Sequence, residues 1–394
     1  MNRKTGKKQN AIKTGKKQDA IKTGQAFLLA MMILILMLFT GGCASSSTAS
    51  ETTLPTSAPV PLPAESVIVE TPASGEGSAP VPTAEPMPEQ TPDQGTDPMQ
   101  DTAFILPDPA MRPVAVMIDN EGNRPLPQAG IRQAQIVYEV LTEYRITRYM
   151  ALFWGTMPEM IGPVRSSRHY FLDWAMEHDA IYTHYGWSPK AQRDISKQHI
   201  QNINGLVNGD AFWDTDSNRN NWQDSFTSKA RVEASIARLK YRTEPKVAFP
   251  FHYSDTFLAP FSGEAATSIK LTFGNGFTAG YSYNGQTGLY ERILNGKAQM
   301  ERNTGLQVTP RNILVQIVPS VPITGDEKFR INVKTVGSGK GWFITGGKSR
   351  AITWEKTARE AQTSYAFEDG SPLVLNPGQM WIEVIPTAST VAIH

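Results

Sequence analysis

The chain has one cysteine, Cys43, among its 394 residues. A single cysteine excludes any intramolecular disulfide, so a disulfide-stapled scaffold is ruled out. The six histidines show no metal-ligand spacing such as His-Glu-x-x-His, and no ordered set of Ser, His and Asp stands out. The sequence therefore predicts no metal site, no cofactor and no catalytic residue of a known type.

Long hydrophobic runs are also scarce near the N-terminus. Residues 26–39 form an apolar run of 14 residues, shorter than the roughly 20 that a membrane-spanning helix needs. Eight Lys or Arg and one acid precede it within the first 25 residues. A basic region followed by a short apolar core is typical of a signal peptide, which we place at residues 1–42. An uncleaved signal anchor with a free thiol remains the alternative.

The end of the apolar run resembles a bacterial lipoprotein cleavage box, Thr40-Gly41-Gly42-Cys43. The resemblance implies that the Cys43 thiol carries a diacylglyceryl group and that the Cys43 amine becomes the new N-terminus. Two or more acyl chains give a stable membrane anchor, which one chain does not. We therefore expect a lipid-anchored protein on the extracytoplasmic face of the cell membrane.

Basic residues are absent between residues 44 and 109, which hold ten acids and thirteen prolines. Such a segment buries too little apolar surface to offset its ordering entropy, so residues 43–109 are predicted to be a lipidated, disordered tether. Residues 110–394 contain 30 basic and 26 acidic residues, a balance of only +4. The lack of a concentrated basic face argues against nucleic acid as a partner.

The first part of the remaining chain, residues 110–252, reads as an α/β domain. Residues 113–118 predict a strand buried on both faces, which ends in Asp119 and Asn120. Residues 136–143 and 147–154 predict a hairpin. Glu139 and Glu143, four apart on one strand, are expected to share a face. Helices are expected to begin at Ser188-Pro189 and at Ser228.

The most informative stretch is Gly162-Pro163-Val164-Arg165-Ser166-Ser167-Arg168. Ser166 or Ser167 is predicted to cap and start a helix. The free N–H groups of a helix start, beside Arg165 and Arg168, would attract a carboxylate, phosphate or sulfate. The alternative is that these arginines pair with carboxylates of their own chain.

A polar cleft is predicted where strand ends, the hairpin and this helix start converge. Glu139 and Glu143 could serve acid/base chemistry, but salt bridges to Arg148, Arg165 or Arg168 are the ordinary way to bury such carboxylates. His184 is expected to be a buried, hydrogen-bonded histidine. The candidate ligand-binding residues are Asp119, Asn120, Glu139, Arg148, Arg165, Ser166, Arg168 and His184.

One further segment imitates a metal site. Asp214, Asp216 and Asn218 are spaced like the start of a calcium loop. Arg219 replaces the required glycine and Ser225 replaces the bidentate glutamate, so the segment lacks two defining features. No calcium site is predicted, although the three oxygen ligands leave the question open.

The second part, residues 253–394, is predicted to be a β-rich, mostly antiparallel domain. Short β runs alternate with turn pairs such as Asn284-Gly285, Asn295-Gly296 and Asp369-Gly370. Asn-Gly and Asp-Gly between alternating apolar runs are strong hairpin signals. The whole chain is thus expected to be of the α+β class, with a mixed first domain and a β-rich second one.

Five segments together resemble the YerB-type lipoproteins, a family whose function is not established. They are residues 113–120, 136–139, 147–148, 162–168 and 378–382, and the resemblance covers about residues 112–386. It implies a lipoprotein of the cell envelope with a two-part fold, and no reaction.

The sequence favours a non-enzymatic function. We expect a protein that binds an anionic or glycan component of the envelope or a wall-associated protein, with the membrane contacted through the lipid anchor. The alternative is a wall-polymer hydrolase that uses the carboxylates of Asp119 and Glu139, with Arg165 and Arg168 as an anion clamp. Arginine neighbours keep carboxylates ionised and make them poor acids, which weighs against the hydrolase.

Overall fold

The computed structural model describes residues 104–143, 146–216, 223–274 and 276–394, which belong to one compact unit, Glu89–His394. The predicted signal peptide, Cys43 and most of the predicted tether lie outside the described residues. Residues 104–110 have no regular secondary structure. Within the described ranges, no helix combines the length and the hydrophobicity needed to cross a membrane.

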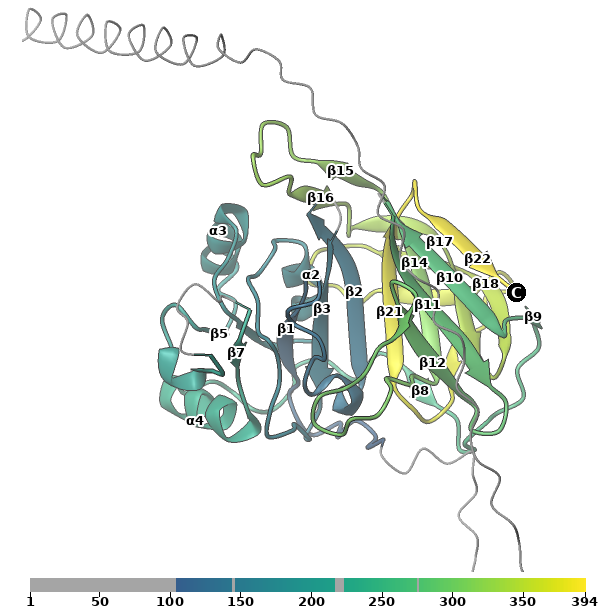
Figure 1. Ribbon diagram of the computed structural model, residues 1–394, viewed down its shortest axis with the longest axis horizontal. Coiled ribbons are helices and arrows are strands. Elements are labelled where there is room, and N and C mark those ends of the chain that lie inside the picture. The colour runs from purple at the N-terminus through teal and green to yellow at the C-terminus, as the bar shows by residue number, and fades with distance from the viewer. Residues whose placement is uncertain (1–103, 144–145, 217–222, 275) are drawn as a thin grey trace, which may run out of the picture. The chain divides into compact units, whose positions relative to one another are not determined.

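Five strands of the N-terminal half lie next to one another in one mixed sheet, in the order β2-β3-β1-β4-β5 (Figure 1). The predicted hairpin is confirmed, because β2 and β3 pair in antiparallel fashion. The first strand is buried along its whole length, as its apolar sequence predicts. The strands are β1 (Val114–Asn120), β2 (Ile136–Glu143), β3 (Ile146–Phe153), β4 (Ile181–His184) and β5 (Asn202–Asn204).

The same sheet continues into the C-terminal half without a break. The order β19-β18-β17-β14-β21-β2 places β21 between two parallel neighbours, β14 and β2. Ladder hydrogen bonds therefore cross the predicted boundary at residues 252 and 253, and the division into two domains stays a prediction. These strands are β14 (Asn312–Val318), β17 (Gly337–Thr345), β18 (Lys348–Lys356), β19 (Ser364–Phe367) and β21 (Met380–Pro386), with β9 (Glu264–Ala265) paired to β18.

A second, antiparallel sheet of five strands has the order β13-β12-β11-β10-β22. Ile269, Leu271 and Tyr281 of this sheet belong to the same buried cluster as Leu314 and Ile382 of the large sheet. The two sheets therefore share a core. The strands are β10 (Ser268–Phe273), β11 (Phe277–Asn284), β12 (Leu289–Leu294), β13 (Lys297–Ala298) and β22 (Thr390–Ile393).

Several short strand pairs and two 3-10 turns complete the described fold. The antiparallel pairs are β6 (Trp213–Asp214) with β7 (Ser225–Phe226) and β15 (Ser320–Pro322) with β16 (Ile331–Val333). The parallel pair is β8 (His252–Tyr253) with β20 (Val374–Leu375), and the 3-10 turns are η1 (Ile131–Gln133) and η2 (Gly209–Ala211). The strands predominate over the helices, so the α+β prediction is confirmed only in this coarser form.

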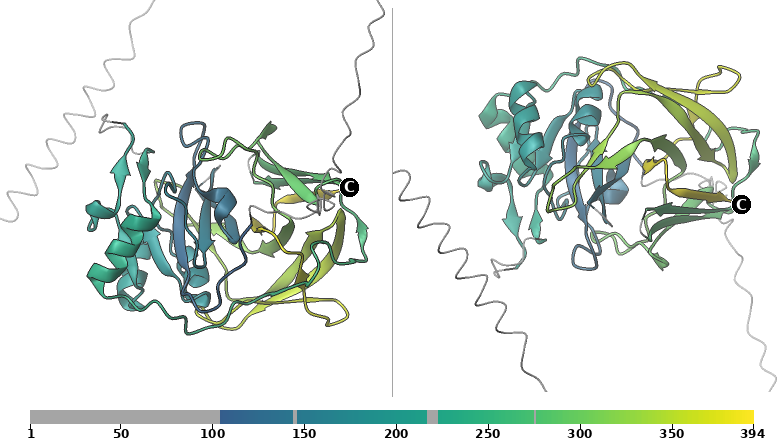
Figure 2. Two further views of the ribbon diagram at one scale, coloured as in Figure 1. Left: turned by 90° about the horizontal axis from the view of Figure 1, so that it is seen from below. Right: turned by 90° about the horizontal axis from the view of Figure 1, so that it is seen from above.

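In the described part of the chain, three helices lie beside the N-terminal strands, whereas the C-terminal half is built of strands (Figure 2). Helix α3 (Pro189–Lys197) begins with proline and is capped by Ser188, whose hydroxyl accepts a hydrogen bond from Ala191 N. Helix α4 (Lys229–Leu239) is capped in the same way by Ser228. Both predicted helix starts are confirmed.

The predicted helix start at Ser166 or Ser167 is wrong. Helix α2 spans only Phe171–Glu177, and no side chain caps its first turn. The preceding segment is extended because its backbone pairs with β1 on one side and with the residues after β4 on the other: Arg165 N donates to Met117 O, and Ser188 N donates to Ser167 O. Backbone groups that are already paired cannot act as the free donors of a helix terminus.

Candidate functional site

Five of the eight predicted ligand-binding residues gather at one edge of the large sheet: Asp119, Arg148, Arg165, Ser166 and Arg168. Strands β1 and β2 both pair antiparallel to β3, and β4 pairs parallel to β1, so the carboxyl ends of β1, β2 and β4 meet there. In sheets with parallel strands, this is the edge where ligands bind. The extended segment 162–168 runs along it, because Val164 bridges Ile118 and Ser167 bridges Trp187.

Three arginines converge at this edge with three carboxylates. We call this group the arginine cluster: Arg148, Arg165, Arg168, Asp119, Glu121 and Glu143. Arg165 contacts Asp119 Oδ2 through Nε and Glu121 Oε2 through Nη2, both at 3.1 Å. The buried carboxylate of Asp119 also accepts a hydrogen bond from Gln223 Nε2 at 2.9 Å. Asp119 and Arg165, predicted to lie together, are thus in direct contact.

The other two arginines share the remaining carboxylate. Arg168 Nε donates to Glu143 Oε1 at 2.6 Å, and Arg148 Nη2 lies 3.8 Å from Glu143 Oε2. Arg148 also donates from Nη1 to Ser166 O at 2.6 Å. Its Nε is buried and has no hydrogen-bond partner among the described residues. Arg148, Ser166 and Arg168 therefore lie together, as predicted.

Burial and neighbouring charges shift the pKa values of the arginine cluster. Burial and, to a smaller extent, the neighbouring Arg148 lower the pKa of Arg168 to about 10. Burial and Arg148 likewise lower the pKa of Arg165. Burial would raise the pKa of Glu143, but Arg148 and Arg168 outweigh it and lower that pKa. An additional negative charge near Arg148 would relieve the repulsion among the three guanidinium groups.

The arginine cluster is not sealed. The side chains of Arg165 and Arg168 are 14% and 13% exposed, and that of Glu121 is 37% exposed, whereas Arg148 is 1% exposed. Glu121 is the most accessible carboxylate of the arginine cluster, and it contacts Arg165 Nη2. A planar guanidinium matches carboxylate and phosphate groups in shape. An external anion could therefore replace the Glu121 carboxylate at Arg165.

His184 lies apart from these charges. It is fully buried, with Nδ1 2.7 Å from Gly186 O and Nε2 3.1 Å from Asn202 Oδ1. Burial lowers the pKa of His184 to about 4. The expectation of a buried, hydrogen-bonded histidine is confirmed, and its neutral ring supports the strand end without facing the arginine cluster.

Glu139 does not pair with Arg148, Arg165 or Arg168, which corrects the sequence-based expectation. Its Oε2 contacts Arg292 Nη2, and its Oε1 accepts hydrogen bonds from Thr147 Oγ1 and, at 3.3 Å, from Asn120 Nδ2. Asn120 and Glu139 are therefore in contact with each other, as predicted. The Glu139 carboxylate, however, pairs with Arg292 and lies away from the arginine cluster.

A β-bulge explains why Glu139 and Glu143 differ. Glu139 pairs with Tyr149 and Leu141 with Thr147, but Glu143 pairs with Ile146, one residue out of register. A one-residue shift turns side chains to the other face of a strand. Glu143 therefore reaches Arg148 and Arg168, and the prediction of a shared face is wrong.

Glu139 belongs to a second charged group, fully enclosed between the two sheets. We call Glu139, Arg292 and Glu383 the buried ionic centre; each is 0% exposed. Glu139 and Glu383 are direct neighbours across β2 and β21, and Arg292 Nη1 lies 2.8 Å from Glu383 Oε1. The Arg292 guanidinium also lies 3.8 Å from the centroid of the Trp381 ring. One guanidinium thus links strands of both sheets.

Two carboxyl groups share one cation in the buried ionic centre. Burial, reinforced by Glu139 and opposed by Arg292, raises the pKa of Glu383 to about 8, so this carboxyl should keep its proton at neutral pH. With one carboxyl protonated, the net charge of the three groups is zero. A neutral group has the lowest desolvation free energy in an enclosed site.

The raised pKa predicts a pH dependence of stability. A proton held more tightly in the folded state stabilises fully below the ordinary glutamate pKa of 4.5, and this stability is lost as the pH rises through about 8. Between pH 7 and 9, where the buried histidines no longer titrate, the free energy of unfolding should fall for the wild type and stay level for Glu383→Gln. Urea titrations at each pH measure it; parallel curves for the two proteins would refute the shared proton.

Sequence reasoning missed Arg292 and Glu383. Arg292 takes a buried position of β12 between Tyr290 and Leu294, and Glu383 interrupts the apolar run of β21. A charged residue at such a position is the signal that could have marked them. The partner of each is more than 90 residues away in sequence, so spacing could not pair them.

The carboxylates proposed for a hydrolase are occupied. Both oxygens of Glu139 accept contacts, and Asp119 is bound by Arg165 and Gln223. Among the described residues, no group of three or more His, Cys, Asp or Glu could hold a metal ion. Asn218 of the calcium-like segment lies outside the described residues.

Comparisons with known proteins identify relatives of the whole folded part. The models of the protein of unknown function DUF3048 match as an N-terminal domain over residues 105–242 and a C-terminal domain over residues 269–382. The chain is 31% identical over 290 residues to "Putative lipoprotein YerB" of Bacillus subtilis (strain 168), covering 72% of this chain and 83% of that protein. It also resembles the crystal structure of the YerB protein from Bacillus subtilis, with a TM-score of 0.63, 28% identity and coverage of 72% and 94% of the two chains.

Proposed function

Because the chain belongs to the YerB-type DUF3048 family, whose function is unknown, we propose that it is a lipoprotein that binds an anionic component of the cell envelope at the arginine cluster. Lipid on Cys43 would anchor it to the extracytoplasmic face of the membrane. The acidic, proline-rich tether would let the folded part reach beyond the membrane surface.

One observation carries the proposal: three arginines meet at the carboxyl edge of the sheet, where burial and Arg148 lower the pKa of both Arg165 and Arg168. Two of these side chains reach the surface, and Glu121 holds an exchangeable position beside Arg165. The edge is formed by the ends of several strands, so the donors are held by the sheet and need little ordering when they bind.

The alternatives weighed from sequence have less support. A neutral glycan would not need three guanidinium groups, and a wall-associated protein would have to present a carboxylate or phosphate to them. Hydrolysis would require a carboxylate free to exchange protons with a substrate, and Glu139 is fully enclosed. These alternatives are outcomes of the experiment below.

Arg165→Ala with Arg168→Ala should lower the affinity of the full-length chain for isolated cell-wall material about tenfold or more. The reason is that charge-assisted hydrogen bonds contribute about 1.5–3 kcal/mol each. Co-sedimentation of the detergent-purified chain with the wall measures the change. Glu121→Gln should act in the opposite direction, because it removes the competing carboxylate.

The matched control is Arg238→Ala with Arg350→Ala, which removes two surface arginines that also have carboxylate partners, Asp210 and Asp369. Thermal unfolding would verify that each variant folds, and Arg165→Lys keeps a charge beside Asp119 if the alanine variant does not. Equal losses in both double variants would indicate bulk charge attraction. Release of soluble fragments by the wild type but not by Glu139→Gln would establish the hydrolase instead.

A further inference from the structure

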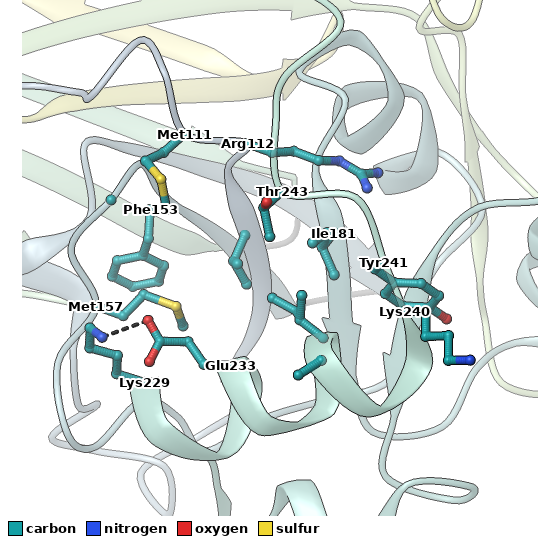
Figure 3. Close-up of a pocket in the computed structure, with 14 residues that line it drawn as sticks. Met111, Arg112, Phe153, Met157, Ile181, Lys229, Glu233, Lys240, Tyr241 and Thr243 are labelled. Carbon is teal, nitrogen blue, oxygen red and sulfur yellow. Dashed lines mark hydrogen bonds and ion pairs between the residues drawn. The ribbon is translucent and has the colours of Figure 1, made fainter.

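A second site lies at the opposite edge of the large sheet. A pocket of about 430 Å³ opens between α4 and the first residues of β1 and β4 (Figure 3). Val114 and Ile181 begin those strands, and Phe153 ends β3 beside them. The arginine cluster lies at the carboxyl ends of β1 and β2, so the two sites are separated by the length of the strands.

Apolar side chains form most of the pocket wall. Helix α4 contributes Ile236 and Ala237, and Ile236 is only half-buried although it belongs to the apolar face of the helix. The helix therefore leaves part of this face unfilled against the sheet. Two flexible thioethers, Met111 and Met157, line the pocket and can adapt to the shape of a ligand. The apolar lining residues are Met111, Val114, Phe153, Met157, Ile181, Ile236 and Ala237.

The rim of the pocket is basic. Lys229 and Lys240 lie at the two ends of α4, and Glu233 is the single acid among the lining residues. Lys229 Nζ contacts Glu233 Oε1 at 2.5 Å, and both side chains are well exposed, at 40% and 54%. An exposed pair of this kind contributes at most about 1 kcal/mol, so a ligand carboxylate could take over the lysine. Arg112 is engaged by Asp179 and helps to close the inner wall.

We propose that this pocket binds the acyl chain of a fatty acid, with the fatty-acid carboxylate at Lys229. The volume lies in the lower part of the range of about 300–1,000 Å³ for small-molecule sites, which favours one chain over two. The lining supplies apolar contact along the chain, and the rim supplies the complementary charge. The inference does not depend on anion binding at the arginine cluster.

The test is photo-crosslinking of the full-length protein in native membranes with a diazirine-bearing palmitate. The expected crosslinks map to peptides that contain Met157 or residues 229–241. Ala237→Trp should reduce the labelling by roughly tenfold, equivalent to about 1.4 kcal/mol, because the indole fills the mouth of the pocket. Ala237 is exposed, so this change places no strain on the core.

Ala234→Trp is the matched control, since Ala234 is exposed on the same helix and does not line the pocket. It should label like the wild type. Lys229→Gln should reduce labelling by the palmitate probe but not by the corresponding alcohol. Crosslinks outside the pocket, equal labelling of both tryptophan variants, or no labelling of the wild type would each overturn the proposal. Loss with the alcohol as well would refute the role of Lys229.

Discussion

Arg292→Leu is expected to lower the free energy of unfolding by about 3–5 kcal/mol, enough to unfold much of the chain. The substitution removes the one cation that contacts both Glu139 and Glu383, each of which is 0% exposed. Glu139 would retain its hydrogen bonds from Thr147 and Asn120, but its charge would have no counter-ion. The damage would extend across both sheets, because β12 carries Arg292 while β2 and β21 carry the carboxylates.

Urea unfolding followed by circular dichroism measures this loss. Arg350→Leu is the control, because Arg350 contacts Asp369 at the surface and should change stability by less than about 1 kcal/mol. Adding Glu139→Gln and Glu383→Gln to Arg292→Leu should restore part of the stability, since no charge then remains enclosed. A single Arg292→Leu variant as stable as the control would contradict the importance of the buried ionic centre.

Cys43→Ala should abolish the incorporation of a fatty-acid label into the protein, because Cys43 is the only thiol in the chain. The expected effect is all-or-none. Each buried CH₂ contributes about 0.8 kcal/mol to membrane binding, so two or more acyl chains hold the protein at the membrane and their loss leaves only the signal segment. Metabolic labelling of cells with an alkyne fatty acid measures it.

Ser46→Ala, three residues further along, is the control and should label like the wild type. Membrane fractionation alone would be less informative, since an uncleaved apolar run at residues 26–39 could retain the variant at the membrane. A labelled Cys43→Ala variant would show that the label is not on Cys43. The alternative, an uncleaved signal anchor with a free Cys43 thiol, would then be favoured.

Local patterns predicted the elements whose structure depends on near neighbours. The largely apolar segments 136–143 and 147–154, only three residues apart, predicted a hairpin, and β2 and β3 form it. Ser188 followed by Pro189 produced a correct helix start, because both residues act within the first turn. In the C-terminal half, Asn284-Gly285 and Asn295-Gly296 marked turns next to β11, β12 and β13.

The failures come from partners that are distant in sequence. Ser166 and Ser167 follow helix-start chemistry, but backbone pairing with β1 and with Trp187 keeps this segment extended. No residue pattern in the sequence marks the β-bulge before Glu143. The bulge nevertheless determines which arginine each glutamate contacts. The position of β21 between β14 and β2 brings Glu383 beside Glu139, and nothing local indicates that arrangement.

The candidate site was therefore predicted in its residue types and only partly in its contacts. Arg165 meets Asp119, and Arg168 meets a glutamate, as the salt-bridge alternative required. That glutamate is Glu143, because Glu139 is drawn into the buried ionic centre by Arg292. The pocket beneath α4 could not be predicted, since a hollow depends on how a helix lies against a sheet.

The binding of the full-length chain to cell-wall material before and after chemical removal of its anionic polymers tests the proposed function most directly. If the arginine cluster binds an anionic component, removal should weaken the binding about tenfold or more, and the difference between the wild type and the Arg165→Ala, Arg168→Ala variant should disappear. Undiminished binding to the stripped wall, with that difference preserved, would contradict it and assign the arginine cluster to a neutral glycan or a protein partner.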